Sequence, residues 1–142
     1  MTNSSDSKAV VSRYVTAVEA GDEAAIRDCF TEDATWWLGG ELPISGTWRG
    51  RDAILGDFLG TAMRFYEPGS VDLEVTSLLA DGDAVALEWT SRARTVSGDQ
   101  YENHCAAVFH VRDGRIASVR EYMDTLYASE VAFTTERGVS RT

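Results

Sequence analysis

The chain has 142 residues, which is enough for one well-packed domain and too few for two ordinary ones. Hydrophobic residues make up 44% and charged residues 25%, a composition typical of a globular protein. The 23 acidic residues outnumber the 13 basic ones, and the net charge of -10 opposes binding to nucleic acid or to an anionic membrane surface. We therefore expect neither nucleic acid nor a membrane as a partner.

The chain ends and the cysteines set further expectations. Residues 1–9 lack the apolar core of a signal peptide and are predicted to be a disordered tail, and residues 134–142 a frayed one. A single domain over residues 10–133 remains. Cys29 and Cys105 lie within apolar patterns, so we expect buried free thiols and a reducing, cytoplasmic location.

Three helices are predicted ahead of most of the strands. Val10, Tyr14 and Val18 have the i, i+4, i+8 spacing of an amphipathic helix, and Gly21 is expected to end it. A short second helix should follow, and a third is predicted from about residue 51 to residue 66.

The rest of the pattern is β structure. Strands are predicted over residues 34–38, 71–79, 84–96 and 101–111 and after Gly114, with an irregular loop over residues 39–50. Helices first and strands afterwards is the α+β pattern, in which a curved antiparallel sheet wraps three N-terminal helices as a cone-shaped barrel. The interior of such a cone is a natural small-molecule pocket.

The hairpin over residues 101–124 is the most informative segment, because polar side chains interrupt its apolar face. Which carboxylate points inward depends on the turn, since a slip of one residue sends every side chain to the opposite face. A two-residue loop of Asp113 and Gly114 would place Arg120 and Asp124 on the apolar face.

A three-residue loop gives a more coherent apolar face. With Gly114 in the left-handed position of a bulge, Glu121 lies opposite Cys105 and shares a face with Asn103. We prefer this register, and it favours Glu121 over Asp124 as the inward carboxylate.

Glu121 has the properties expected of an acid or base. A carboxyl group on an apolar face is desolvated, which raises its pKa toward neutrality, and Asn103 can donate a hydrogen bond to a developing oxyanion. A turn at residues 98–99 would bring Arg92 and Glu88 to the same face, where Arg92 would set the charge of Glu121. A structural ion pair between Arg92 and Glu121 is the alternative.

Six stretches carry a resemblance to a known group of proteins: Val11–Asp22, Phe30–Thr35, Ser45–Ile54, Tyr101–Asn103, Asp113–Ile116 and Arg120–Thr125. They resemble the nuclear transport factor 2-like superfamily, and within it the ketosteroid isomerases and the SnoaL-like polyketide cyclases. The resemblance covers residues 10 to about 127 and implies the fold. It does not specify the reaction, because this scaffold hosts isomerases, cyclases, epoxide hydrolases and non-enzymatic binders.

Site residues carry over from these families only in part. Ketosteroid isomerases have an oxyanion-stabilising tyrosine on the first helix, which Tyr14 matches. Leu38 stands where those enzymes have a catalytic aspartate, and their aspartic acid donor falls near Ala107, so the resemblance does not imply steroid isomerisation by that mechanism.

Limonene-epoxide hydrolases provide a second comparison. Their last-strand aspartate matches Glu121, but the other two members of their aspartate, arginine and aspartate set fall at Glu88 and Thr90. An inward last-strand carboxylate and a first-helix tyrosine are what remain, as in the cyclases.

We expect the protein to bind a small hydrophobic compound bearing a carbonyl or hydroxyl group. Cofactor-free proton transfer of the isomerase or cyclase type is the favoured reaction, with epoxide opening by an activated water, or ligand binding without catalysis, as alternatives. The expected catalytic residues are Glu121, Tyr14, Asn103 and Arg92. The expected substrate contacts are Glu88, Tyr101, Trp36, Trp37, Trp48, Phe58, Phe109, Met123 and Asp124.

No metal is expected, because His104 and His110 lack a third ligand at a suitable spacing, and no cofactor motif is present. A homodimer is expected through the outer face of the sheet. That face would carry His104, Ala106, Val108 and Tyr122 and is more apolar than a solvated face should be.

Overall fold

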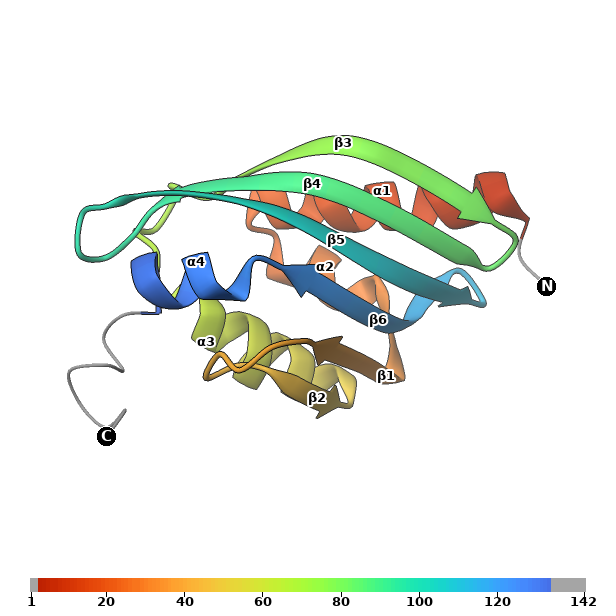
Figure 1. The fold of residues 1–142 in the computed structure, drawn as a ribbon. Helices are drawn as coiled ribbons and strands as arrows, with labels where there is room; N and C mark the ends of the chain where they lie inside the picture. Colours follow the sequence, from red (N-terminus) through yellow and green to blue (C-terminus); the bar gives the residue numbers. More distant parts are fainter. Residues whose placement is uncertain (1–2, 134–142) are drawn as a thin grey trace.

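The computed structural model describes residues 3–133, which form a curved six-stranded sheet with three helices on one face (Figure 1). The elements are α1 (Ser4–Ala20), α2 (Glu23–Asp28), β1 (Phe30–Leu38), β2 (Gly46–Arg49), the π-helix η1 (Ala53–Leu59), α3 (Gly60–Met63), β3 (Asp72–Asp81), β4 (Ala84–Arg94), β5 (Gln100–Arg112), β6 (Arg115–Met123) and α4 (Thr125–Val131). The strand order is β2-β1-β6-β5-β4-β3, and only the β1–β6 pair is parallel. The predicted α+β class with a curved sheet around helices is confirmed.

The first helix begins earlier than predicted. It starts at Ser4, and the side chain of Asn3 caps its first turn by accepting a backbone N–H. Ser7 is fully buried and donates a hydrogen bond to the carbonyl of Gly82, in the β3–β4 turn. The expected disordered tail is therefore wrong for residues 4–9, because Asn3 caps a helix there and the hydroxyls of Ser4 and Ser7 bond to the backbone of Gly82. The frayed tail predicted for residues 134–142 lies outside the described residues.

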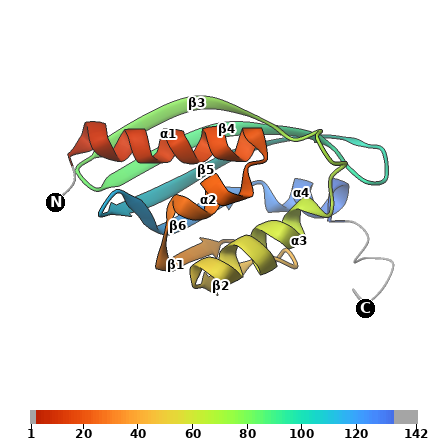
Figure 2. The same cartoon turned by 180° about the vertical axis from the view of Figure 1, so that it is seen from behind.

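Gly21 ends α1 as predicted, with a left-handed φ of 65° that suits glycine. The third predicted helix is present as η1 followed by α3. Figure 2 shows α1, α2 and α3 lying along the same face of the sheet. Two elements were missed: β2 lies within the expected loop, and α4 follows β6 directly, with Asp124 as its N-cap.

The β5–β6 turn differs from the register that the sequence favoured. Arg112 pairs with Arg115, so Asp113 and Gly114 form a two-residue turn, and both have positive φ angles, 53° and 76°. Ala117 is then an extra residue in β6, and pairing resumes one residue out of step.

This bulge decides which side chains of β6 point inward. Beyond it, Phe109 pairs with Val119, and Glu121 pairs with Ala107 instead of the expected Cys105. The shift relative to the predicted register is two residues, so the face is the same. Glu121 stays on the inner face although the predicted turn was wrong.

The β4–β5 turn also differs from its prediction, and here the face is inverted. Arg94 pairs with Gln100, which leaves five residues in the loop instead of two. Thr95 is fully buried, and its N–H and hydroxyl both bond to Asp99. The neighbouring N–H of Val96 donates to the carbonyl of Phe65, just after α3. These bonds hold the loop away from β5, so the ladder starts three residues earlier than predicted.

Candidate functional site

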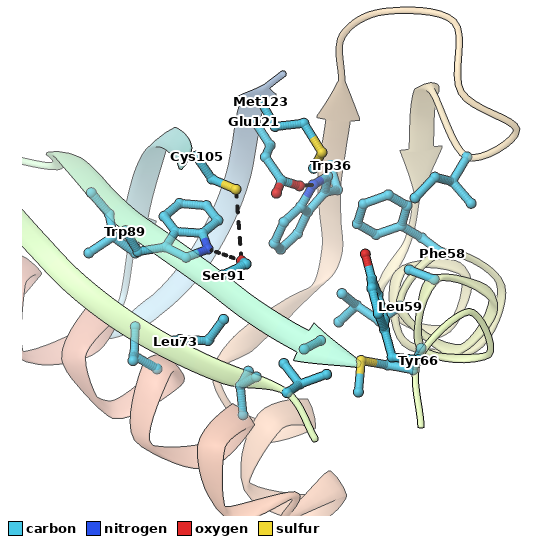
Figure 3. A pocket seen from close by; sticks show the side chains of 18 of the residues that line it. Trp36, Phe58, Leu59, Tyr66, Leu73, Trp89, Ser91, Cys105, Glu121 and Met123 are labelled. Carbon is cyan, nitrogen blue, oxygen red and sulfur yellow. Dashed lines mark hydrogen bonds between the residues drawn. The ribbon is translucent and has the colours of Figure 1, made fainter. Parts of the chain in front are cut away.

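A cavity of about 150 Å³ lies between the inner face of the sheet and the helices α1, η1 and α3 (Figure 3). Its wall is almost entirely apolar and aromatic. Five of the predicted substrate contacts line it: Trp36, Phe58, Tyr101, Phe109 and Met123. Phe133, just after α4, also lines it. The cavity is about as large as an engineered apolar cavity that holds benzene.

Glu121 is the one carboxyl group among the described residues that line this cavity. Its side chain is 7% exposed, and its Oε1 accepts a hydrogen bond of 3.0 Å from the indole Nε1 of Trp36 (Figure 3). Burial raises the pKa of Glu121 to about 7, although the Trp36 hydrogen bond lowers it by stabilising the carboxylate. At neutral pH the group is therefore populated in both its acid and its base form.

The sheet register places Glu121 between two positions that the family resemblance made informative. It pairs with Leu38 of β1 on one side and with Ala107 of β5 on the other. The resemblance to ketosteroid isomerases implies that Leu38, and a position near Ala107, match the two acidic residues of those enzymes. The single carboxyl of this cavity therefore lies on the strand between them.

Tyr14 lines the same cavity from α1. Its ring packs against Phe30, Trp36 and Phe109, with centroid distances of 5.4, 6.2 and 5.9 Å. Burial, followed by the negative charge of Glu121, raises the pKa of Tyr14 well above its usual range. Tyr14 is thus a neutral hydrogen-bond donor near Glu121 at any pH at which the protein would work.

Asn103 is buried, but it is not among the residues that line the cavity. Its Nδ2 donates to the backbone carbonyl of Asp124 at 3.1 Å and to the hydroxyl of Tyr101 at 2.8 Å, and its Oδ1 accepts from the Asp124 N–H at 3.3 Å. The expected direct contact between Asn103 and a substrate is therefore wrong, because its amide is used inside the protein.

Arg92 and Glu88 are on the outer face of the sheet, and their predicted inward placement is wrong. Arg92 is exposed and forms ion pairs with Glu74 at 2.7 Å and Glu102 at 3.6 Å, so it does not pair with Glu121. Glu88 is also exposed. The cause is the five-residue β4–β5 loop, which turns this set of side chains outward.

Three further expected substrate contacts do not line the cavity. Asp124 is exposed and caps α4, as the preference for Glu121 implied. Trp37 faces the other side of β1, where its ring lies 5.3 Å from that of Tyr122. Trp48 packs behind Phe58 at 5.8 Å and donates its Nε1–H to a backbone carbonyl.

The same inversion brings in residues that the sequence analysis missed. Trp89, Ser91 and Cys105 form a connected group on the cavity wall, in which the Trp89 Nε1 donates to the Ser91 hydroxyl at 2.9 Å (Figure 3). Tyr66 also lines the cavity. The missed signal was the alternation in β4, where Leu87 and Trp89 are apolar and the residues between and after them are polar or charged.

A family model described as a SnoaL-like domain matches residues 11–119, so the chain belongs to the SnoaL-like domain family. No curated protein matches the chain significantly. Many solved structures share the fold.

Three of these structures illustrate the range. Bal32a, from a soil-derived mobile gene cassette, is 27% identical with a TM-score of 0.78, covering 88% of this chain and 94% of its own. A cystatin-like protein of unknown function from Xanthomonas campestris is also 27% identical, with a TM-score of 0.77 and coverages of 94% and 98%. A putative SnoaL-like polyketide cyclase from Jannaschia sp. CCS1 is 14% identical, with a TM-score of 0.80 and coverages of 94% and 96%.

Cys29 and Cys105 are both buried free thiols, as predicted. Burial, followed by the nearby charge of Glu121, raises the pKa of the Cys105 thiol to about 12. Cys105 is therefore a neutral thiol in the cavity wall and a poor nucleophile. No helix within residues 3–133 has the length and apolar character needed to cross a bilayer.

Proposed function

We propose that the protein binds a small apolar carbonyl or hydroxyl compound and moves a proton on it without a cofactor. The observation that carries this proposal is the burial of Glu121 in the wall of an apolar cavity with a pKa of about 7. General acid–base groups work best when their pKa is close to the working pH.

In this scheme the ionised Glu121 removes a proton from the carbon next to the substrate carbonyl. The C–H bonding pair forms a C=C bond, and the carbonyl oxygen takes up negative charge. Tyr14, which stays protonated because its pKa is raised, donates a hydrogen bond to that oxygen. Protonated Glu121 then returns the proton to another carbon or to oxygen, which completes an isomerisation or assists a ring closure.

The size of the cavity narrows the substrate class. Ligand pockets typically measure about 300–1,000 Å³. A cavity of about 150 Å³ accepts a compound with one ring, whereas a four-ring steroid would require the helices to move apart.

Hydrogen exchange on a simple ketone tests the proposal without knowledge of the natural substrate. Cyclohexanone in heavy water should exchange its α-hydrogens faster with protein than with buffer, and Glu121→Gln should reduce the protein-dependent rate by about 100-fold or more. Glu88→Gln is the matched control, because Glu88 is a glutamate on the outer face. Equal rates for the wild type and Glu121→Gln would refute proton transfer by Glu121.

A binding role without turnover is the second candidate. It is favoured by the positions of Asn103 and Arg92, which give Glu121 no direct assistance in the cavity. In that case cyclohexanone should bind with similar affinity to the wild type and to Glu121→Gln, while exchange stays at the rate in buffer.

We also propose that the protein is a homodimer through the outer face of its sheet and that it is cytoplasmic, in keeping with its two free thiols. Tyr122, 50% exposed, lies on this face with its ring edge-on to that of Trp37, at 5.3 Å. Tyr122→Lys should shift sedimentation from dimer to monomer. Leu126→Lys, at an equally apolar exposed position on α4, should not. A wild type that is monomeric at micromolar concentration would contradict the dimer.

A further inference from the structure

The cavity has a second polar region away from Glu121. Tyr101 lies six positions along β5 from Ala107, the cross-strand neighbour of Glu121, which is about 20 Å along the strand between backbone positions. The ring of Tyr66, three residues after α3, lies 5.2 Å from the ring of Tyr101, and both residues line the cavity. Burial raises the pKa values of both side chains, and both lie close enough to Glu121 for its negative charge to raise them further.

Asn103 fixes the direction of the hydrogen bonds at Tyr101. The Oδ1 of Asn103 accepts from the backbone N–H of Asp124, which can only donate, so the orientation of the amide is determined. The Nδ2 therefore faces Tyr101 and donates to its hydroxyl oxygen at 2.8 Å.

The Tyr101 hydroxyl also keeps its own proton. Its polar neighbours, Asn103 first and then Tyr66, lower the pKa of Tyr101. Burial is the larger effect and keeps the pKa of Tyr101 at about 12, so its hydroxyl stays protonated.

The proton of Tyr101 is left for a ligand. A phenol has one O–H donor and two lone pairs, and Asn103 uses one of the lone pairs. No hydrogen bond among the described residues uses the proton itself. Since Tyr101 is buried in the cavity wall, an acceptor atom on a bound molecule would satisfy it.

We propose that the ligand is a small ring compound with two oxygen functions, one at Glu121 and a second, an acceptor, at the Tyr101 hydroxyl. Asn103 acts as a positioning residue, because it directs the Tyr101 proton into the cavity without touching the ligand. The inference rests on the proposed function in that the first oxygen function is the one processed at Glu121.

Two matched ligand pairs test the inference by calorimetry: cyclohexanone with 1,4-cyclohexanedione, and acetophenone with 1,4-diacetylbenzene. The pairs differ in the span between their oxygens. In at least one pair the second carbonyl should tighten binding to the wild type, and Tyr101→Phe should reduce that gain about fivefold, which is the effect of one hydrogen bond. The affinity of the monoketone should not change.

Variants separate positioning from general damage. Asn103→Leu should lose the same gain at a temperature at which it is folded, although loss of its bonds to Asp124 lowers its stability. Tyr127→Phe is the control, because the ring of Tyr127 stacks on that of Tyr101 at 5.3 Å while its hydroxyl accepts from the Glu102 N–H. It should keep the full gain. If a folded Asn103→Leu variant differs from the wild type only in stability, the ratio of diketone affinity to monoketone affinity keeps its wild-type value, and the positioning role is refuted.

Two results would overturn the ligand class. One is an equal gain from the second carbonyl in the wild type and in Tyr101→Phe. The other is an absence of binding by all four compounds. The measurement involves no turnover, so a gain that depends on Tyr101, together with unchanged exchange in Glu121→Gln, would refute the proposed catalysis and leave the ligand class intact.

Discussion

The β5–β6 and β4–β5 hairpins share strand β5, and the turn of each differs from its prediction. Only in the β4–β5 hairpin do the side chains point to the opposite face from the one predicted. In the first, a two-residue turn is followed by the Ala117 bulge, and the two departures together shift the predicted register by two residues, which leaves the face unchanged. In the second, a five-residue loop replaces a two-residue turn, and the odd difference inverts the face of β4. Whether the register shifts by an odd or an even number of residues therefore decides which side chains reach the cavity.

The consequence for the site is direct. One hairpin keeps Glu121 in the cavity wall, and the other sends Arg92 to the surface and brings Trp89 inside. The cavity is consequently more apolar than the sequence suggested, and Glu121 has a hydrogen bond from Trp36 in place of an ion pair.

The largest effect on stability is expected from shifting the register of β6 by one residue, which exchanges its inward and outward side chains. One alanine inserted after Ser118 would turn Val119 and Glu121 outward and force Arg120 toward the cavity. Loss of apolar burial and an unpaired buried cation should cost about 5 kcal/mol or more, comparable to the whole stability of a small domain. Chemical denaturation followed by circular dichroism measures this loss.

Deletion of Ala117 is the matched control for that insertion. It removes the bulge but keeps Ser118 paired with His110, so the face of β6 is preserved. The expected loss is about 2 kcal/mol or less. If the insertion were tolerated as well as the deletion, a one-residue shift in register would not decide which side chains of this hairpin point inward.

The next effect concerns stability and pH. The pKa of Glu121 rises from 4.5 to about 7 on folding, so its contribution is most favourable below pH 4.5 and is lost as the pH rises through 7. Glu121→Gln removes this dependence. At pH 8 the variant should be more stable than the wild type by up to about 3 kcal/mol, and the difference should vanish near pH 4.

Urea unfolding of the wild type and Glu121→Gln at pH 4 and pH 8 checks this expectation. Glu88→Gln, on the inverted face of β4, should show no comparable dependence. If Glu121→Gln were strongly destabilised at pH 8, Glu121 would have to be a structural partner in the fold.

A smaller effect is expected at the Trp36 hydrogen bond. Trp36→Phe removes the donor to the carboxylate, so the pKa of Glu121 should rise from about 7 by about one pH unit. The carboxyl infrared band, followed against pH, reports it. Trp48→Phe is the control, because Trp48 packs on the same Phe58 ring but donates to a backbone carbonyl. An equal rise in both variants would point to general loosening of the core.

The smallest effect is expected at Arg92. Arg92→Met breaks exposed ion pairs with Glu74 and Glu102, and the pKa of Glu121 should not move. The rate of ketone exchange should stay within about twofold of the wild type, because exposed ion pairs contribute little. A marked rise in the pKa of Glu121 in this variant would mean that Arg92 reaches the cavity in solution.

Local sequence was sufficient for the class of the fold and for much of its framework. The spacing of Val10, Tyr14 and Val18 gave the first helix, and the positive φ of Gly21 ended it as expected. The apolar alternation of β5 and β6 made Glu121 the inward carboxylate whichever bulge produced that face. Such patterns depend on residues a few positions apart in the chain, so they can be read from the sequence.

Tertiary structure decided the rest. The β4–β5 loop is held by the buried Thr95 and by a bond from Val96 to a residue just after α3, a partner about thirty positions away. Asn103 likewise acts on Tyr101 and on the backbone of Asp124 because β5 and the start of α4 meet in space. Such contacts between distant residues decide which face a side chain joins and which way a hydrogen bond points. The sequence by itself therefore determined the carboxyl group of the site, and the fold determined the partners of that carboxyl group.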